Sequence, residues 1–233
     1  IGEVGTANST PEELSAYVEG YRRALGSGLT GMSKISIQTG TSHGGVVLPD
    51  GSIAKVAIDF KVIDTLGEMC RKQFGIGGVV QHGASTLPES AFDNFPKHQA
   101  MEVHLATGFQ NALFDSTAFP KNLKEQIYKW LDANCASEKK PDQTPEQFYY
   151  KTRKKGYGPF KRELWSLTDN TKSALMSELA RQFDMHFTKL SIKGSRDAVA
   201  KFVKPAEVHH PFPKAGAVKA SAKIEHDDNP LAD

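Results

Sequence analysis

Two histidines occupy matching places in the sequence, each followed by glycine and each close behind a strand-like apolar stretch. One is His43, in the turn 41–45, and the other is His82, in the turn 81–85. Imidazole nitrogen is a ligand that suits zinc and similar divalent ions. Glycine lets the backbone approach an ion or a phosphate closely, and its N–H groups can bind phosphate oxygens. The pair therefore indicates a site that combines a metal ion with a phosphate.

A third strand-like stretch ends in a turn that carries His104 and Thr107. The carboxyl ends of parallel strands share one edge of a sheet, and ligands bind at that edge in α/β proteins. The hydroxyl groups of Ser85 and Thr107 would then add phosphate-binding donors. A single histidine at a strand end is more often a structural residue. The repetition over neighbouring turns is what favours a metal and phosphate site.

Helix signals are strong at four places. Thr10 offers a hydroxyl cap, Pro11 stands at the first helical position, and Glu13 completes a capping box. Three later stretches carry apolar residues at helical spacing, and Gly75 ends the first of them. The predicted helices cover residues 11–24, 58–74, 120–134 and 169 (or 170)–187.

Strand-like sequence lies between these helices. Alternating or glycine-bounded apolar residues predict strands at 34–39, 77–81 and 101–106. Strands separated by helices predict an α/β fold with parallel strands, because parallel strands need long crossover connections. The segment 134–157 is long, polar and rich in lysine, so we expect an insertion rather than a core element.

The composition is that of an ordinary globular chain. Its 233 residues (25.5 kDa) are 39% hydrophobic and 24% charged, which excludes collagen-like, coiled-coil and wholly disordered proteins. A net charge of +2 does not indicate a nucleic-acid binder, and no apolar run approaches the roughly 18 residues of a membrane span. Cys70 and Cys135 cannot form a disulfide framework, so we expect a reduced, cytoplasmic setting.

The two ends of the chain also carry information. The sequence opens at Ile1, without methionine, on a stretch that resembles the tail of a strand, so we expect a trimmed terminus or a missing first half. Residues 191–233 show little periodicity and predict an extended arm or tail. The doublet His209–His210 favours a surface loop over a metal site, because adjacent histidines point in different directions and metal ligands must converge.

The order of the three turns resembles the second half of a class II, metal-dependent fructose-bisphosphate aldolase. The similarity extends to 154–159 and 165–168, and it covers residues 1–190. It implies a TIM (β/α)8 barrel with its site at the carboxyl ends of the strands, of which this chain supplies about the last three or four β/α units. It also implies reversible aldol cleavage of fructose 1,6-bisphosphate to dihydroxyacetone phosphate and glyceraldehyde 3-phosphate.

The resemblance assigns cations to two of the turns. His43 and His82 would be two ligands of a catalytic divalent ion, usually zinc. Carbonyl oxygens of Ser42, Gly44 and Gly83 would help to hold a monovalent cation, K+ or Na+.

The resemblance also assigns the two phosphates of the substrate. The residues that would hold the first phosphate are Gly44, Gly83, Ser85 and Thr107. Either Lys161 or Arg162 matches the arginine that holds the far phosphate in the longer-chain subclass. Arg162 is favoured, because a guanidinium can bind a phosphate through two parallel hydrogen bonds.

The sequence departs from the family pattern in two turns. His104 stands where the family has an asparagine that contacts the substrate, and it would either hydrogen-bond a substrate hydroxyl or serve the structure. The loop 6–9 carries no carboxylate where the family has a proton shuttle.

The family's remaining metal-binding histidine and its catalytic aspartate would lie upstream of Ile1. Three or four parallel strands cannot close a barrel, and a complete barrel needs about 250 residues. We therefore expect the chain to work with the N-terminal half of the same enzyme, as a homodimer or larger homo-oligomer, without nucleic acid or membrane.

Three other functions stay open at this stage. Tagatose bisphosphate is the nearest rival substrate, since the two sugars differ in one stereocentre. A non-catalytic barrel that binds a sugar phosphate would need no metal. A structural half-barrel subunit would act only by completing a partner chain.

Overall fold

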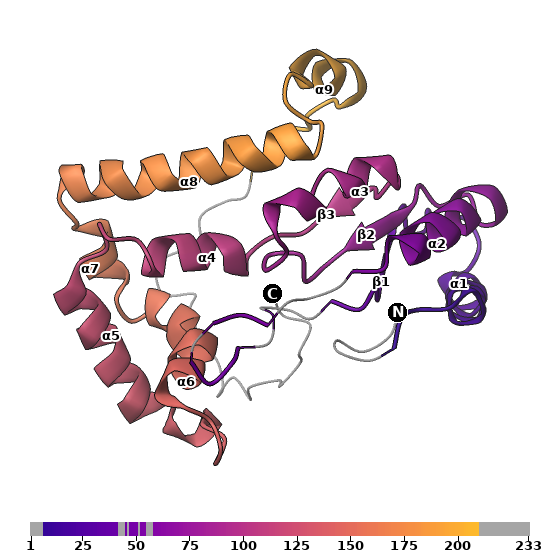
Figure 1. The fold of residues 1–233 in the computed structure, drawn as a ribbon. Coiled ribbons are helices and arrows are strands. Elements are labelled where there is room, and N and C mark those ends of the chain that lie inside the picture. Colours follow the sequence, from indigo (N-terminus) through magenta and orange to yellow (C-terminus); the bar gives the residue numbers. More distant parts are fainter. Residues whose placement is uncertain (1–6, 42–44, 46, 51, 55–57, 210–233) are drawn as a thin grey trace.

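A small parallel sheet lies at the centre of the fold (Figure 1). The computed structural model describes residues 7–41, 45, 47–50, 52–54 and 58–209. The sheet order is β1 (Ile35–Ile37), β2 (Val79–Gln81) and β3 (Glu102–Val103), and both neighbouring pairs are parallel. The predicted α/β class with parallel strands is confirmed, although each strand is shorter than its predicted range.

Two helices pack with the sheet into a first core cluster. Thr10 caps α1 (Pro11–Leu25) by the predicted box, since its hydroxyl accepts from Glu13 N at 3.3 Å and its N–H donates to Glu13 Oε2 at 2.9 Å. Asp59 caps α2 (Phe60–Gln73), the crossover between β1 and β2. The buried residues of this cluster are Leu14, Val18, Ile35, Ile37, Ile63, Leu66, Cys70, Ile76, Val79, Ala84, Leu87, Phe92 and Phe95.

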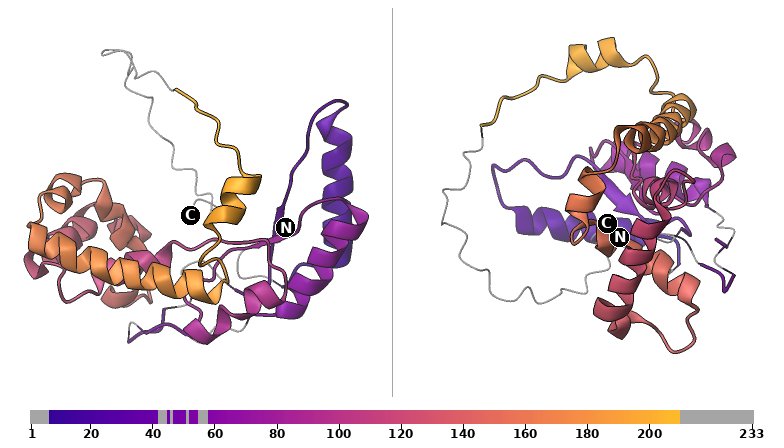
Figure 2. Two further views of the ribbon diagram at one scale, coloured as in Figure 1. Left: turned by 90° about the horizontal axis from the view of Figure 1, so that it is seen from above. Right: turned by 90° about the vertical axis from the view of Figure 1, so that its left-hand side faces the viewer.

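A second core cluster forms from helices at the opposite end of the molecule from α1 (Figure 2). The elements that follow β2 are η1 (Glu89–Ala91), α3 (Asn94–Lys97), β3, α4 (Thr107–Phe114), α5 (Lys121–Asn134), η2 (Ala136–Glu138), α6 (Pro145–Thr152), η3 (Arg153–Tyr157), α7 (Lys161–Trp165), α8 (Asp169–Lys189) and α9 (Arg196–Phe202). The buried residues of the second cluster are Phe114, Phe119, Leu123, Ile127, Leu131, Cys135, Phe148 and Leu175. The predicted helices at 120–134 and 169–187 are confirmed as α5 and α8.

The expectation that 134–157 lies outside the core is wrong for its second half. Thr144 caps α6 with a second capping box, which fixes one face of this short helix against the second cluster. Phe148 on that face is 2% exposed, and Gly156 of η3 packs so closely that an added Cβ would lie 2.6 Å from Ile127. The lysines made the segment look polar in the sequence, although α6 carries a short apolar face.

The sheet is open within the described part of the chain, with β1 and β3 at its edges. A closed (β/α)8 barrel is therefore not seen among these residues. Each edge strand carries backbone groups that could pair with a further strand.

The end of the described chain contains a helix that the sequence analysis did not expect. Within the predicted arm 191–233, residues 196–202 form α9, and residues 210–233 lie outside the described part. His209 is exposed and 3.1 Å from Glu207, as expected for a surface loop, whereas His210 lies outside the described residues.

Cys70 and Cys135 are both buried free thiols. Among the helices that the structure describes, none has both the length and the apolar character needed to cross a bilayer.

Replacing Phe148 by alanine tests whether α6 belongs to the core. We expect the free energy of unfolding to fall by about 3–5 kcal/mol, because a buried ring leaves a cavity. Phe202→Ala on α9, where the side chain is 77% exposed, should change it by less than about 0.5 kcal/mol. Urea unfolding measures both, and an equally small effect in the two variants would contradict the placement of α6.

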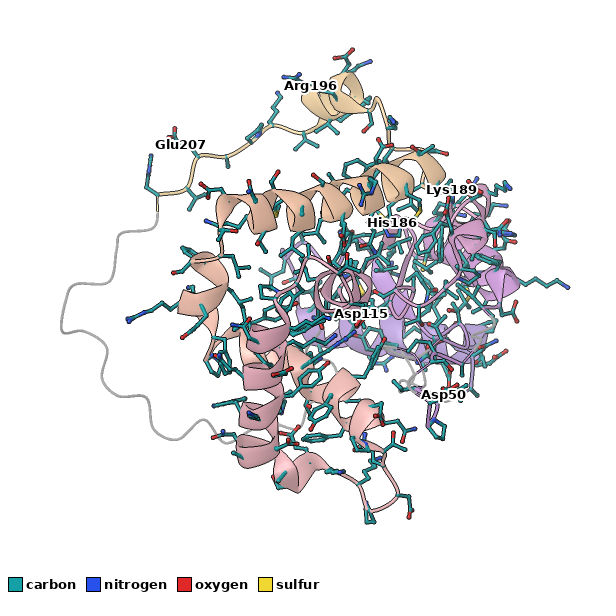
Figure 3. All side chains as sticks on the ribbon, turned by 60° about the vertical axis from the view of Figure 1, so that its left-hand side comes forward. Asp50, Asp115, His186, Lys189, Arg196 and Glu207 are labelled. Atoms are coloured by element: carbon teal, nitrogen blue, oxygen red, sulfur yellow. The ribbon has the colours of Figure 1, made fainter. Side chains whose placement is uncertain are left out.

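His186 of α8 provides a pH test of the packing between α8 and the first cluster. Its ring is 6% exposed and lies 4.6 Å from the Phe92 ring, and Figure 3 shows it on α8 close to Lys189. Burial lowers the pKa of His186, so protonation favours the unfolded chain. The free energy of unfolding should therefore fall as the pH drops below about 6.5. His186→Phe should lose less of it than the wild type between pH 7.5 and 5.5. Equal losses in urea unfolding would count against this role.

Candidate functional site

A buried amide joins the carboxyl ends of β1 and β2. The Gln81 side chain is 1% exposed; its Oε1 accepts from Thr39 Oγ1 at 2.8 Å, and its Nε2 donates to Thr41 Oγ1 at 2.9 Å. The same Nε2 also donates to the carbonyl of His82, to which Thr41 Oγ1 donates at 2.9 Å. Because buried polar groups are costly unless paired, this network fixes where the chain leaves β2.

Two predicted site histidines come together at this end of the sheet. His82 follows β2 directly, and His104 follows β3, whose backbone continues the ladder through a bond from His104 N to Gln81 O at 2.9 Å. The centroids of the two imidazole rings are 4.3 Å apart, with an angle of 43° between the rings. The parallel register thus places both rings at one edge, as the sequence analysis predicted for strand-end residues.

A carboxylate and a lysine hold one side of this pair. His104 Nε2 is hydrogen-bonded to Glu102, the first residue of β3, and the other Glu102 oxygen pairs with Lys34 just before β1. The hydrogen bonds from Lys34 and from His104 lower the pKa of Glu102, so it stays ionised. A carboxylate on one ring nitrogen fixes the ring orientation and leaves the other nitrogen to a ligand.

The β3–α4 turn packs against the turn that follows β2. Ser85 Oγ accepts from Ala106 N at 3.1 Å. An added Cβ on Gly108 would lie 3.2 Å from Ser85 O, a tight contact, so glycine favours this close approach of the first turn of α4. Thr107, the first residue of α4, therefore lies beside Ser85, the arrangement that a shared phosphate would need.

The structure places the other residues of the predicted site as follows. Ser42, His43 and Gly44 lie outside the described residues. Gly83 has φ +70°, a left-handed conformation that favours glycine in the turn behind His82. The ligand pair His43–His82 and the monovalent cation site therefore stay predictions.

The described residues contain two imidazoles of the kind that can bind zinc. His82 and His104 have the right donor atoms and lie at the edge where parallel sheets bind ligands. No group of three His, Cys, Asp or Glu side chains suited to a metal ion occurs in the described ranges. A complete set would have to include residues such as His43 from outside them.

Arg162 is not brought to this group of residues. It lies on α7, beside α5 and α8 and away from the sheet (Figure 1). There it lines a surface hollow of about 470 Å³ with Lys161 and Trp165, and the Lys161 ammonium lies 5.0 Å from the Trp165 ring centroid. The first and the far phosphate positions that the resemblance assigns are thus apart in this structure.

Sequence reasoning missed the residues that support the site. Gln81 and Thr41 lie within the turn motifs, but those motifs assign no role to their side chains. Polar residues at the ends of apolar strands were the available signal for the amide network. Glu102 and His104 are two residues apart, so along a strand both side chains lie on one face. This spacing was a signal for their pairing.

Removing the Gln81 amide tests the strand-end network. We expect Gln81→Met to lower the free energy of unfolding by about 1–3 kcal/mol, since Thr39, Thr41 and the His82 carbonyl lose a buried partner. Gln126→Met on the exposed face of α5 is the matched control, with an expected change below about 0.5 kcal/mol. Urea unfolding compares the two, and equal values would refute the network's role.

No protein-family model matches the chain, and no curated protein sequence matches it.

Proposed function

We propose that the chain forms the strand-end, phosphate-binding part of a metal-dependent aldolase that acts on a bisphosphorylated ketose, fructose 1,6-bisphosphate in the first instance. The observation that carries the proposal is the convergence of His82, His104 and the hydrogen bond from Ala106 N to Ser85 Oγ, next to Thr107, at the carboxyl ends of β2 and β3. These are the residues for which the turn motifs predicted metal or substrate contacts. The aldolase resemblance supplies the reaction.

The phosphate end of the substrate binds between two turns. Ser85 and Thr107 offer hydroxyl groups, and the first turn of α4 offers backbone N–H groups with the positive end of a helix dipole. Ala106 at the cap position has no side-chain oxygen to occupy these groups. The bound phosphate fixes one end of the ketose, and such orientation lowers the barrier to reaction.

The reacting end of the substrate lies toward the two imidazoles. A divalent ion held by His43 and His82 would polarise the substrate carbonyl as a Lewis acid. His104, oriented by Glu102, hydrogen-bonds a substrate hydroxyl in place of the family's asparagine. The Gln81 network keeps the turn after β2 in place while substrate binds.

The proposal needs groups that the described residues do not contain. The open edges of the sheet accept further barrel strands, which bring a third histidine and the catalytic aspartate. These strands come from the N-terminal half of the same enzyme, and the assembled enzyme is a homodimer or larger homo-oligomer in the cytoplasm.

An aldol-cleavage assay tests the function. The polypeptide, together with any N-terminal half that co-purifies, is supplied with zinc and assayed on fructose and tagatose 1,6-bisphosphates, with glyceraldehyde 3-phosphate as the detected product. We expect cleavage that stops when a chelator removes the metal and returns when zinc is restored.

His82→Ala should lower kcat/KM by at least about a hundredfold, because a Lewis-acid ion contributes several kcal/mol to the transition state. His209→Ala is the matched control: this histidine is 87% exposed on its side chain and pairs with Glu207. Unchanged turnover in His82→Ala would overturn the ligand assignment. Sugar-phosphate binding without cleavage or metal dependence would instead identify a non-catalytic binding barrel.

A further inference from the structure

Arg153 is a buried cation whose partners lie on three helices, which are α4 with its C-cap, α5 and α6. The residue is 5% exposed, and its guanidinium binds both oxygens of Asp115, at 2.7 and 3.1 Å. One of its nitrogens also donates to Asn111 Oδ1 at 2.5 Å. The guanidinium carbon lies 5.2 Å from the Phe114 ring centroid and 5.0 Å from that of Tyr150. Figure 3 places Asp115 among the helices of the second cluster.

Two of these partners, Asn111 and Phe114, lie on α4, and Asp115 is its C-cap. Asn111 and Asp115 are four residues apart, so both face η3 from one side of α4 and its C-cap. Asn111 Nδ2 also donates to Tyr150 at 2.9 Å, and Lys124 Nζ donates to the carbonyl of Phe114 at 2.7 Å. A planar guanidinium with fixed donors restrains both the position and the rotation of the helix it binds.

The opposite end of α4 carries the candidate phosphate-binding turn. Ala106 N donates to Ser85 Oγ, and the close approach of Gly108 to Ser85 O leaves little room for movement. An eight-residue helix is about 12 Å long. A shift of α4 at its Arg153 end is therefore passed along a rigid element to Thr107.

We propose that Arg153 is a positioning residue for the phosphate site: by holding Asn111 and Asp115, it sets α4 so that Thr107 lies beside Ser85. The inference rests on the proposed function, because it takes Ser85 and the neighbouring first turn of α4 as the phosphate site. It gives a role in substrate binding to the second core cluster, which adjoins the end of α4 opposite Thr107.

The test replaces Arg153 by methionine, which keeps much of the apolar stem and removes the guanidinium. Lys155→Met is the matched control, since Lys155 lies on the same short helix and pairs with Glu138 of η2, at 2.6 Å, instead of with α4. Three quantities are measured: hydrogen exchange of the amides of 107–114, the Kd for inorganic phosphate by calorimetry, and kcat and KM for fructose 1,6-bisphosphate in the assembled enzyme.

We expect Arg153→Met to speed exchange in 107–114 and to raise the phosphate Kd and the KM by about tenfold, with kcat changed less than about twofold. Misplacement of binding groups by about 1 Å can lower the reaction rate up to about a hundredfold. A tenfold change in Kd and KM therefore needs only a small shift of α4. Lys155→Met should leave all three quantities near the wild-type values.

The inference is overturned if Arg153→Met binds phosphate with the wild-type Kd. It is also overturned if Lys155→Met loses as much phosphate affinity as Arg153→Met. If Arg153→Met does not fold, Asp115→Asn, which weakens the same bidentate pair, is measured in its place with the same expectations. If the wild-type protein binds no phosphate and cleaves no bisphosphate, the proposed function fails and the phosphate role of Arg153 fails with it. The exchange data then still report whether Arg153 holds α4.

Discussion

The buried amide of Gln81 is the interaction on which the candidate site depends. It joins hydroxyl groups at the end of β1 to the backbone that leaves β2, and every polar atom of this side chain has a partner. In a site of low dielectric, an unpaired amide would be costly, so the network permits one arrangement of the turn that carries His82. His104 then reaches His82 because β3 pairs in parallel with β2 at a fixed register.

Helix α4 connects the two halves of the fold. Its first residue lies beside Ser85 at the sheet, while Phe114 at its last position belongs to the second core cluster. The guanidinium of Arg153 therefore acts at one end of an element whose other end faces the proposed ligand. Packing that looks remote from the strand ends is coupled to them through a single short helix.

The features that could be predicted from the sequence are those set by neighbouring residues. The capping box of Thr10 and Glu13 is local, and so is the alternation of helices with apolar strands that indicates parallel pairing. The gathering of His82, Ser85, His104 and Thr107 followed from the general rule that parallel strands end at one edge.

Features that depend on distant partners could not be predicted in the same way. The lysines of 134–157 indicated a solvent-exposed segment, yet Phe148 is buried because the preceding α-helix, α5, supplies a complementary apolar face. Arg153 gave no local sign that it would bind Asp115, thirty-eight residues earlier. Arg162 was assigned by motif alone, and its position on α7 depends on how the second cluster packs.

Anomalous X-ray diffraction at the zinc edge, from crystals of the protein grown with zinc and phosphate, tests the proposed metal and phosphate site most directly. We expect a zinc peak about 2.0–2.1 Å from an imidazole nitrogen of His82, with phosphate density in contact with the Ser85 and Thr107 hydroxyl groups. Zinc bound elsewhere, with the carboxyl ends of β2 and β3 free of both ion and phosphate, would contradict it.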